Sequence, residues 1–315
     1  MSPAPVALFA YNRPDHLIRT LKALQASPLA AASELHVFAD GPKQAEDVPA
    51  VNQVRDIIER ITGFARICRH EQRENLGLSA SVINGVTELS RQYGRVIVLE
   101  DDLVVAPGFL TFMNRALDRY EGESRVMQVS GYMFPVDRSA RLATTFFCRI
   151  PTSWGWATWE RAWRCLNLDS AALVSLLRDR GQQDGFNVDG AYPYFEHLKL
   201  HAEGKMDVWG VRWYASMFIS EGLCLYPSRS LVQNIGMDGS GVHCGQSSAF
   251  DVELSGQESW PFPDQIQESR AAFESIRSFL LEVRGQKRPR AIVDLFSRVG
   301  AVLSRMKEAV MSPVA

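Results

Sequence analysis

Paired cysteines, long apolar runs and an excess of basic charge are all missing from this 315-residue sequence. The five cysteines are scattered, odd in number and form no Cys-x-x-Cys pair, which argues against a disulfide framework or a cysteine zinc site. A formal net charge of -2 gives no reason to expect nucleic-acid binding. No segment approaches the roughly 20 apolar residues of a membrane helix, and the N-terminus lacks a signal-peptide pattern. We therefore expect a soluble cytoplasmic protein.

The first half of the chain alternates short apolar runs with amphipathic helices, a pattern typical of a parallel β-sheet. Each polar loop that follows a strand then falls at a carboxyl end, where such sheets bind their ligands. Asn12, Asp40 and the triplet Glu100-Asp101-Asp102 all stand at such ends. The sequence thus predicts a Rossmann-like half-sheet with a ligand site at one edge. The strands are expected at residues 6–10, 35–39, 64–69 and 95–99, and further strands at 126–130, 144–148 and 223–227.

Three consecutive carboxylates, Glu100, Asp101 and Asp102, follow the apolar run at 95–99. Like charges oppose one another's ionisation and oppose folding unless a cation or hydrogen-bond donors offset them. Mg²⁺ and Mn²⁺ prefer hard oxygen ligands and leave coordination positions for substrate phosphates. The triplet therefore suggests a divalent-metal site. The alternative is a solvated acidic turn before a helix, whose N-terminus favours acidic residues in any case.

Residues 98–109, Val-Leu-Glu-Asp-Asp-Leu-Val-Val-Ala-Pro-Gly-Phe, resemble the Glu-Asp-Asp segment of Golgi N-acetylglucosaminyltransferases and of bacterial family-2-like sugar transferases. This resemblance implies a GT-A-type α/β fold, a mixed sheet flanked by helices, and a nucleotide-sugar substrate. It also implies that Asp102 ligates Mn²⁺ or Mg²⁺. Asp101 and Glu100 would then contact the nucleotide-sugar or hold the loop.

The same resemblance assigns the nucleotide to the loops after the first two strands. Tyr11, Asn12 and Arg13 would line it, and Asp40 would accept a hydrogen bond from the base or ribose. Arg13 could also reach a phosphate, because a planar guanidinium suits phosphate oxygens. Asn75 lies in a loop similar to an Asn-x-Gly motif of the bacterial enzymes. Local alternatives stay open: Asn12 as a helix cap, Asp40 as an Asx-turn residue and Asn75 as part of a turn.

The segment Ser153-Trp154-Gly155-Trp156-Ala157-Thr158-Trp159 resembles a Ser-Trp-Gly-Trp-Ala segment of these transferases. Aromatic faces suit the apolar faces of a pyranose, and a glycine permits close approach. We therefore expect Trp154, Gly155 and Trp156 near the acceptor sugar, joined by Trp209. Clustered tryptophans are nevertheless more often core than binding site, and Trp159 and Trp163 are expected to be packing residues.

The segment Lys205-Met206-Asp207-Val208-Trp209 resembles the region where GT-A enzymes place a catalytic carboxylate, and this resemblance implies that role for Asp207. An inverting transfer needs a base for the acceptor hydroxyl, and apolar neighbours would raise the pKa of a carboxylate toward a useful range. The usual preceding acid is replaced here by Met206, so a structural or acceptor-orienting role stays open. Glu196 and Asp189 are the reserve candidates.

Residues 228–236 resemble an Asn-Leu-Val-x-Asn-Ile-Gly segment of the same group, and a glycine-rich stretch, 236–245, follows. His243 in this stretch is placed where GT-A enzymes carry a C-terminal histidine that binds metal or diphosphate. Such loops lie at the surface, so His243 is not expected in the core. We expect the stretch to order over bound donor and exclude water.

The chain is expected to divide into a catalytic domain, 1–263, and an Arg-rich amphipathic tail, 264–315. The domain would have a nucleotide-sugar half, 1–109, and an acceptor half, 110–263. A basic amphipathic helix can lie on an anionic membrane, which would suit a lipid-linked acceptor. The alternative is that the tail packs on its own domain or on a second subunit.

Taken together, the motifs predict a metal-dependent glycosyltransferase that uses a nucleotide-sugar, preferably a UDP-sugar, and inverts the anomeric carbon. The acceptor would be a glycan or glycolipid in bacterial polysaccharide synthesis. Two alternatives remain: a nucleotidyltransferase with the same acidic metal site, and an inactive carbohydrate-binding scaffold. The sequence lacks the basic glycine-rich loop that a nucleotidyltransferase usually carries, and it lacks a dinucleotide or P-loop fingerprint.

Overall fold

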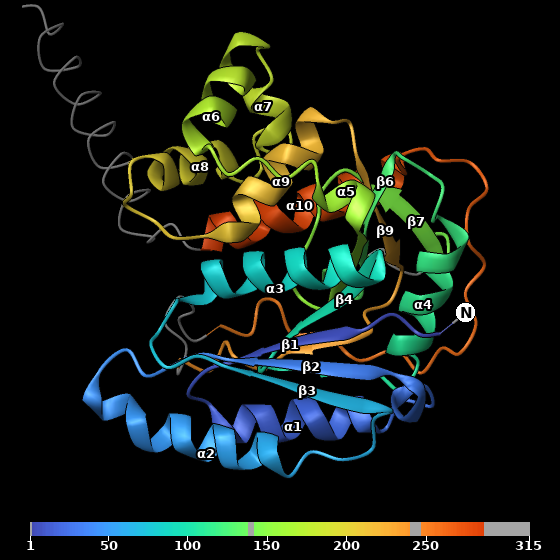
Figure 1. Ribbon diagram of the computed structural model, residues 1–315. Coiled ribbons are helices and arrows are strands. Elements are labelled where there is room, and N and C mark those ends of the chain that lie inside the picture. The colour runs from blue at the N-terminus through green and yellow to red at the C-terminus, as the bar shows by residue number, and fades with distance from the viewer. Residues whose placement is uncertain (1, 138–141, 240–246, 287–315) are drawn as a thin grey trace, which may run out of the picture.

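The computed structural model describes residues 2–137, 142–239 and 247–286. Two sheets and their flanking helices make up this part of the chain (Figure 1). The larger sheet contains β1 (Val6–Ala10), β2 (Glu34–Ala39), β3 (Arg66–Glu71), β4 (Arg95–Glu100), β6 (Val126–Ser130), β7 (Thr145–Cys148), β8 (Trp156–Trp159) and β9 (Leu223–Pro227). The smaller is a ribbon of β5 (Leu103–Val105) and β10 (Val232–Asn234).

The strand order of the larger sheet is β3-β2-β1-β4-β8-β6-β9-β7. β1 pairs in parallel with β2 on one side and with β4 on the other. The chain therefore moves outward from β1 to β3 and then returns to the opposite side of β1 with β4. Doubly wound sheets bind ligands outside the carboxyl ends of their strands at a reversal of this kind, and this region at β1 and β4 is called the crevice below.

β8 is antiparallel to both β4 and β6 and makes the sheet mixed. This strand is not predicted from the sequence, because its four residues, Trp-Ala-Thr-Trp, are typical of a tryptophan cluster. All four are buried, and a short wholly buried strand has no alternation that would reveal it. The seven strands that the sequence predicts agree with the structure to within about two residues at either end.

Helices cover both faces of the sheet (Figure 1). The pair α1 (Pro14–Gln25) and α2 (Val48–Glu59) packs on one face, and α3 (Leu78–Tyr93) packs on the other. Their apolar stripes, including Leu17, Val54 and Val86, are buried against the strands. The remaining helices are α4 (Phe109–Arg119), α5 (Glu160–Trp163), α6 (Ser170–Asp179), α7 (Gln183–Phe186), α8 (Tyr194–Ala202), α9 (Trp209–Ile219) and α10 (Arg270–Gln286), with single 3₁₀ turns η1 (Ala30–Ala32) and η2 (Ala45–Asp47).

The predicted fold class, a Rossmann-like mixed sheet flanked by helices with a helix near the C-terminus, is confirmed. A separate small core joins α6, α7, α8 and α9 around Phe186 and Tyr214, whose rings stack with centroids 4.6 Å apart. In Figure 1, α6, α7 and α8 lie at the top of the view, above α10.

α10 lies within the predicted tail, 264–315, and packs against the predicted catalytic domain. Phe273, Ile276 and Leu280 of α10 are buried in the same core as the sheet. At its start, the Glu268 carboxylate binds the Arg149 guanidinium at 2.6 Å. These buried residues of α10 agree with the alternative in which the tail packs on its own domain. Residues 287–315 of the predicted tail lie outside the described residues.

Within the described ranges, no helix combines the length and the apolar composition needed to cross a bilayer.

Candidate active site at the switch between strands β1 and β4

The loop after β1 and the triplet after β4 meet at the crevice. Arg13 donates through one guanidinium nitrogen to Asp101 Oδ1 and to Asp102 Oδ2, both at 2.8 Å. The backbone N–H of Tyr11 donates to Asp101 Oδ2 at 3.2 Å, and Thr20 Oγ1 of α1 donates to the Asp101 carbonyl at 2.7 Å. Asp101 is thus bound from three directions. The loop after β1 and the triplet after β4 thus meet at one edge of the sheet, as the positions of the strand ends predicted.

Asp102 differs from Asp101 because part of its carboxylate has no partner. Its Oδ1 atom is buried and lacks any hydrogen-bond partner among the described residues. The β5–β10 ribbon fixes the backbone here, since the Ile235 N–H donates to the Asp102 carbonyl at 2.9 Å. A buried carboxylate oxygen without a donor is costly, because it loses hydration and gains nothing in return.

The pKa values of the triplet reflect three acids that, among the described residues, share Arg13 as their cationic neighbour. Burial, followed by Asp102 and Asp101, raises the pKa of Glu100 to about 8. Burial raises the pKa of Asp101 to about 6, although Arg13 opposes the rise. Burial by itself would lower the pKa of Arg13, but the neighbouring carboxylates Asp101 and Asp102 outweigh it and raise that pKa. The site is therefore short of positive charge.

These residues fit a divalent cation held together with a substrate. Mg²⁺ and similar hard ions commonly use one or two protein carboxylates plus substrate phosphates. The unpartnered Oδ1 of Asp102 supplies one such ligand. Within the described residues, no group of three or more His, Cys, Asp or Glu side chains could hold an ion by itself. The arrangement matches an ion that arrives with a diphosphate better than a closed structural site.

Gly236 completes the wall of the crevice. A Cβ atom on this residue would come within 2.1 Å of Asp102 Oδ2 and 2.8 Å of Arg13 Nη1. The backbone N–H of Gly236 donates to Asn234 Oδ1 at 2.7 Å, which fixes the turn after β10. Close approach is therefore the reason for glycine here.

Asp47 of η2 was not identified from the sequence, yet it binds two of the predicted nucleotide residues. Its Oδ2 accepts from the Tyr11 hydroxyl at 2.8 Å and its Oδ1 accepts from Asn12 Nδ2 at 3.0 Å. The Tyr11 hydroxyl lowers the pKa of Asp47 through this hydrogen bond. Asn12 does not cap α1, whose first turn has no side-chain cap. Tyr11 and Asn12 are 36 and 35 positions away from Asp47 in the chain, so no local pattern in the sequence links these residues.

Asp40 has its oxygens directed at the loop before α3. Its Oδ1 accepts from the backbone N–H groups of Gly41 at 2.9 Å and Leu76 at 2.8 Å, and its Oδ2 accepts from that of Gly77 at 2.9 Å. Asn75 Nδ2 donates to the Gly41 carbonyl at 2.9 Å. Asp40 and Asn75 therefore hold the β2 end to the 74–77 loop, and a direct contact with a nucleotide stays a prediction for both.

Three of the four predicted acceptor residues are buried in the structure. Trp156 has no exposed surface, and its ring stacks on Trp209, 5.4 Å away and itself buried. The group that lies close to Gly155 is the side chain of Val232, since a Cβ atom on the glycine would come within 2.6 Å of Val232 Cγ2. The sugar contacts predicted for Trp156, Trp209 and Gly155 are corrected accordingly: buried aromatic area stabilises the core more than it offers a surface.

Trp154 remains compatible with a binding role, because it is only half-buried. Its ring lies edge-on to Tyr132 and to Phe250, with centroids 4.7 Å and 5.7 Å away. Trp159 and Trp163 are buried, which confirms their prediction as packing residues.

The apolar surroundings expected for Asp207 are contradicted, since its side chain is 66% exposed. Asp207 lies in the loop between α8 and α9, and its Oδ1 is 3.9 Å from Nε2 of His201. The reserve candidate Glu196 binds Lys199 at 2.6 Å on the exposed face of α8. Asp189 has a left-handed backbone with φ 49° and offers its carbonyl to Arg277. The assignment of a general base to Asp207 stays a prediction.

His243 lies outside the described residues, as does most of its glycine-rich stretch. A different histidine, His16 of α1, contacts the segment that follows β10, and it was not singled out from the sequence. Its Nε2 lies 3.2 Å from Asp238 Oδ2 and 3.3 Å from the Ile235 carbonyl. His16 thus links the first turn of α1 to the segment after β10.

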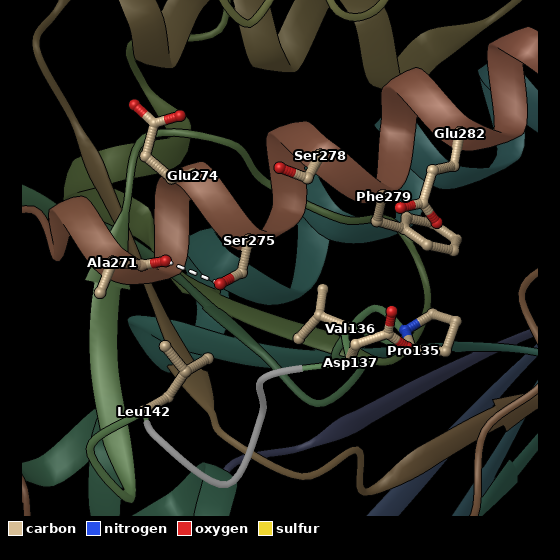
Figure 2. Close-up of a pocket in the computed structure, with 10 residues that line it drawn as sticks. All are labelled: Pro135, Val136, Asp137, Leu142, Ala271, Glu274, Ser275, Ser278, Phe279 and Glu282. Atoms are coloured by element: carbon tan, nitrogen blue, oxygen red, sulfur yellow. Dashed lines mark hydrogen bonds between the residues drawn. The ribbon is translucent and has the colours of Figure 1, made fainter.

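A separate groove lies between α10 and the segment after β6 (Figure 2). Its volume is about 510 Å³, and none of its lining residues belongs to the predicted site. Phe279 and Glu282 lie over Pro135 in Figure 2, whereas the Glu274 carboxylate points away from Val136 and binds Arg270. The predicted donor residues and this groove are thus separate features of the surface.

No protein-family model matches the sequence. Similar solved structures include a mannosyltransferase from Pyrobaculum calidifontis in complex with GDP-Man and Mn²⁺, with 13% identity, 70% coverage of each chain and a TM-score of 0.38. The galactosyltransferase LgtC, in complex with donor and acceptor sugar analogues, has 11% identity, coverage of 70% of this chain and 72% of its own, and a TM-score of 0.37. TarS of S. aureus has 12% identity and a TM-score of 0.29, and the match spans 41% of this chain and 22% of TarS. At these values the activity has to be inferred from the chain's own site.

Proposed function

We propose that this chain is a metal-dependent glycosyltransferase that moves a sugar from a nucleotide-sugar, a UDP-sugar as first candidate, to a glycan or lipid-linked glycan, with inversion. One observation carries the proposal. At the switch between β1 and β4, Arg13 faces Asp101 and Asp102, and Asp102 keeps a buried oxygen without a partner. The resemblance of residues 98–109 to the Glu-Asp-Asp segment of sugar transferases supports the same function.

The donor would lie across the crevice with its diphosphate beside the triplet. Asp102 would hold Mn²⁺ or Mg²⁺ through Oδ1, and the ion would neutralise charge that develops on the departing nucleoside diphosphate. Arg13 orients both aspartates and adds a fixed positive charge that suits phosphate oxygens. The first turn of α1 starts directly after Arg13 and has no side-chain cap, and a helix N-terminus favours an anion.

The acceptor would approach from the side of Trp154. In an inverting reaction its hydroxyl oxygen attacks the anomeric carbon while the bond to the diphosphate breaks, and a base takes the hydroxyl proton. Asp207 is our candidate base, because it is exposed in the loop before α9, where an acceptor could reach it. Trp154 would support the sugar ring with its exposed part.

Nucleotide binding tests this proposal. We would measure thermal stability with UDP-, GDP-, dTDP- and CMP-sugars, each with and without Mn²⁺. A ligand at a hundred times its dissociation constant adds about 2.7 kcal/mol to the free energy of unfolding, so a true donor gives a clear shift. The shift should require Mn²⁺ and disappear in Asp102→Asn. The exposed Asp56 supplies a matched control, because Asp56→Asn should leave the shift unchanged.

Product analysis separates the proposed activity from a nucleotidyltransferase. Sugar transfer releases a nucleoside diphosphate, whereas a nucleotidyl transfer releases pyrophosphate. The absence of a shift with every nucleotide would leave the triplet as an acidic turn and favour the scaffold alternative.

A further inference from the structure

Asp47 is the point at which the first two loops of the donor crevice are joined. Its Oδ2 accepts from the Tyr11 hydroxyl at 2.8 Å and from the Gln44 backbone N–H at 3.1 Å, and its Oδ1 accepts from Asn12 Nδ2 at 3.0 Å. The Lys43 backbone N–H in turn donates to the Tyr11 hydroxyl at 3.0 Å. A single carboxylate thus gathers donors from the loop after β1 and from the turn after β2.

The loop after β1 is therefore held at both ends. On the side of β4, the backbone of Tyr11 and the guanidinium of Arg13 bind the aspartates of the triplet. On the opposite side, the side chains of Tyr11 and Asn12 bind Asp47. The phosphate end of a donor would meet the triplet, so the Asp47 end of the same loop faces the remaining part of the donor, the nucleoside.

An ionised carboxylate accepts hydrogen bonds and donates none. Asp47 therefore fixes the amide of Asn12 with its NH₂ group inward and its oxygen outward. Among the described residues, nothing donates to Asn12 Oδ1, which is left as an open acceptor. The Tyr11 hydroxyl is engaged by Asp47 and Lys43, so the ring of Tyr11 is what remains for a ligand. An open acceptor beside a fixed aromatic ring suits a nucleoside that carries an N–H or O–H donor.

We infer that Asp47 is the positioning residue for the nucleoside half of the donor site, holding Tyr11 and Asn12 so that Asn12 Oδ1 meets a donor group of the base or ribose. This role rests on the proposed function. It separates the site into a diphosphate half, organised by Arg13 and the triplet, and a nucleoside half, organised by Asp47. Asp47 itself need not touch the ligand.

The two halves can be measured separately with different probes. Calorimetry with Mn²⁺ would compare UDP and GDP, which use both halves, with inorganic pyrophosphate, which uses only the diphosphate half. Asp47→Ala should weaken the nucleoside diphosphate that the wild type prefers by about tenfold or more, as expected for lost orientation of two contacts. Pyrophosphate binding should stay within about twofold. Glu46→Ala, an exposed neighbour on η2, should change neither.

Asp47→Asn removes one hydrogen bond with little change of shape. The amide oxygen of the new side chain can still accept from Gln44 and Tyr11. Its NH₂ group, however, faces the NH₂ group of Asn12, and two donors repel, so the Asn12 amide is expected to rotate and turn its oxygen inward. This variant should fold like the wild type and still bind the nucleoside diphosphate more weakly. In an Asn12→Ala, Tyr11→Phe background, Asp47→Ala should have almost no further effect on nucleotide affinity.

The outcomes distinguish this role from the proposed function. Equal weakening of nucleotide and pyrophosphate, an unchanged nucleotide affinity, or additive losses in the double background would each overturn the role of Asp47 and leave the glycosyltransferase proposal intact. A wild-type protein that binds none of the probes would overturn both.

Discussion

Gly236 and Asp102 lie so close together that a Cβ atom on the glycine would come within 2.1 Å of Asp102 Oδ2. The two residues belong to segments far apart in the sequence, brought together by the β5–β10 ribbon. Because the same glycine also borders Arg13, this contact sets how much room the charged side chains of the crevice have.

Gly236→Ala should therefore push Asp102 and Arg13 out of place. We expect a loss of about 1–3 kcal/mol in the free energy of unfolding, as for other overpacked sites. We also expect the Mn²⁺-dependent shift with nucleotide to vanish. Gly256→Ala is the matched control, since nothing lies within 4 Å of a Cβ at that position. Urea unfolding and thermal shift measure the two effects, and normal nucleotide binding by Gly236→Ala would refute the predicted displacement.

Arg13 is the cation that offsets two buried acids, and its side chain is only 20% exposed. Arg13→Met should lower the free energy of unfolding by on the order of 2–4 kcal/mol, because Asp101 and Asp102 lose their shared partner. Mn²⁺ should recover part of that loss by supplying positive charge. The control is Arg164→Met, which breaks an exposed i,i+4 pair with Glu160 and should cost less than about 1 kcal/mol. Similar losses in both variants would contradict this account of the crevice.

Trp156 should behave as a core residue. Trp156→Ala should lower the free energy of unfolding by about 3–5 kcal/mol, the usual cost of deleting a large buried side chain. Trp154→Ala should cost clearly less, since that ring is half-buried, and should instead weaken acceptor use. Urea denaturation and acceptor KM separate the two variants. A stable Trp156→Ala protein with a raised acceptor KM would restore the sequence-based prediction.

A histidine pair on β2 and β3 predicts acid sensitivity. His36 Nδ1 lies 3.2 Å from His70 Nε2. Burial, followed by the charge of His70, lowers the pKa of His36, and burial lowers the pKa of His70. In the unfolded chain, both histidines bind a proton near pH 6.5. The free energy of unfolding is therefore undiminished above about pH 6.5, and it falls as the pH drops from there through the lowered pKa values of the folded state.

His70→Phe keeps the stacking on Phe38, whose ring centroid is 4.3 Å from that of His70, and removes one titrating group. The variant should match the wild type at about pH 7.5 and exceed it at about pH 5 in the free energy of unfolding. Parallel pH profiles of variant and wild type in urea would show that the pair does not cause the acid sensitivity.

Local signals explain what could be predicted of the fold. Apolar runs and helical periodicity located β1, β2, β4 and the helices between them, because these patterns depend only on neighbouring residues. Once these strands were located, the polar residues that follow them could be placed at one edge of the sheet, because the carboxyl ends of parallel strands lie at the same edge. The mixed half was harder, because β8 is a short buried strand made largely of tryptophan.

By itself the sequence determined which chemistry is present and at which edge: the carboxylates of Glu100, Asp101 and Asp102, and the loop from Tyr11 to Arg13. Only the tertiary structure decided which of these groups have partners. Arg13 meets Asp101 across 88 positions and Tyr11 meets Asp47 across 36, and no periodicity in the sequence relates such residues. Burial was decided in the same way: Trp156 is enclosed and Asp207 exposed because exposure depends on what the rest of the chain packs against each of them.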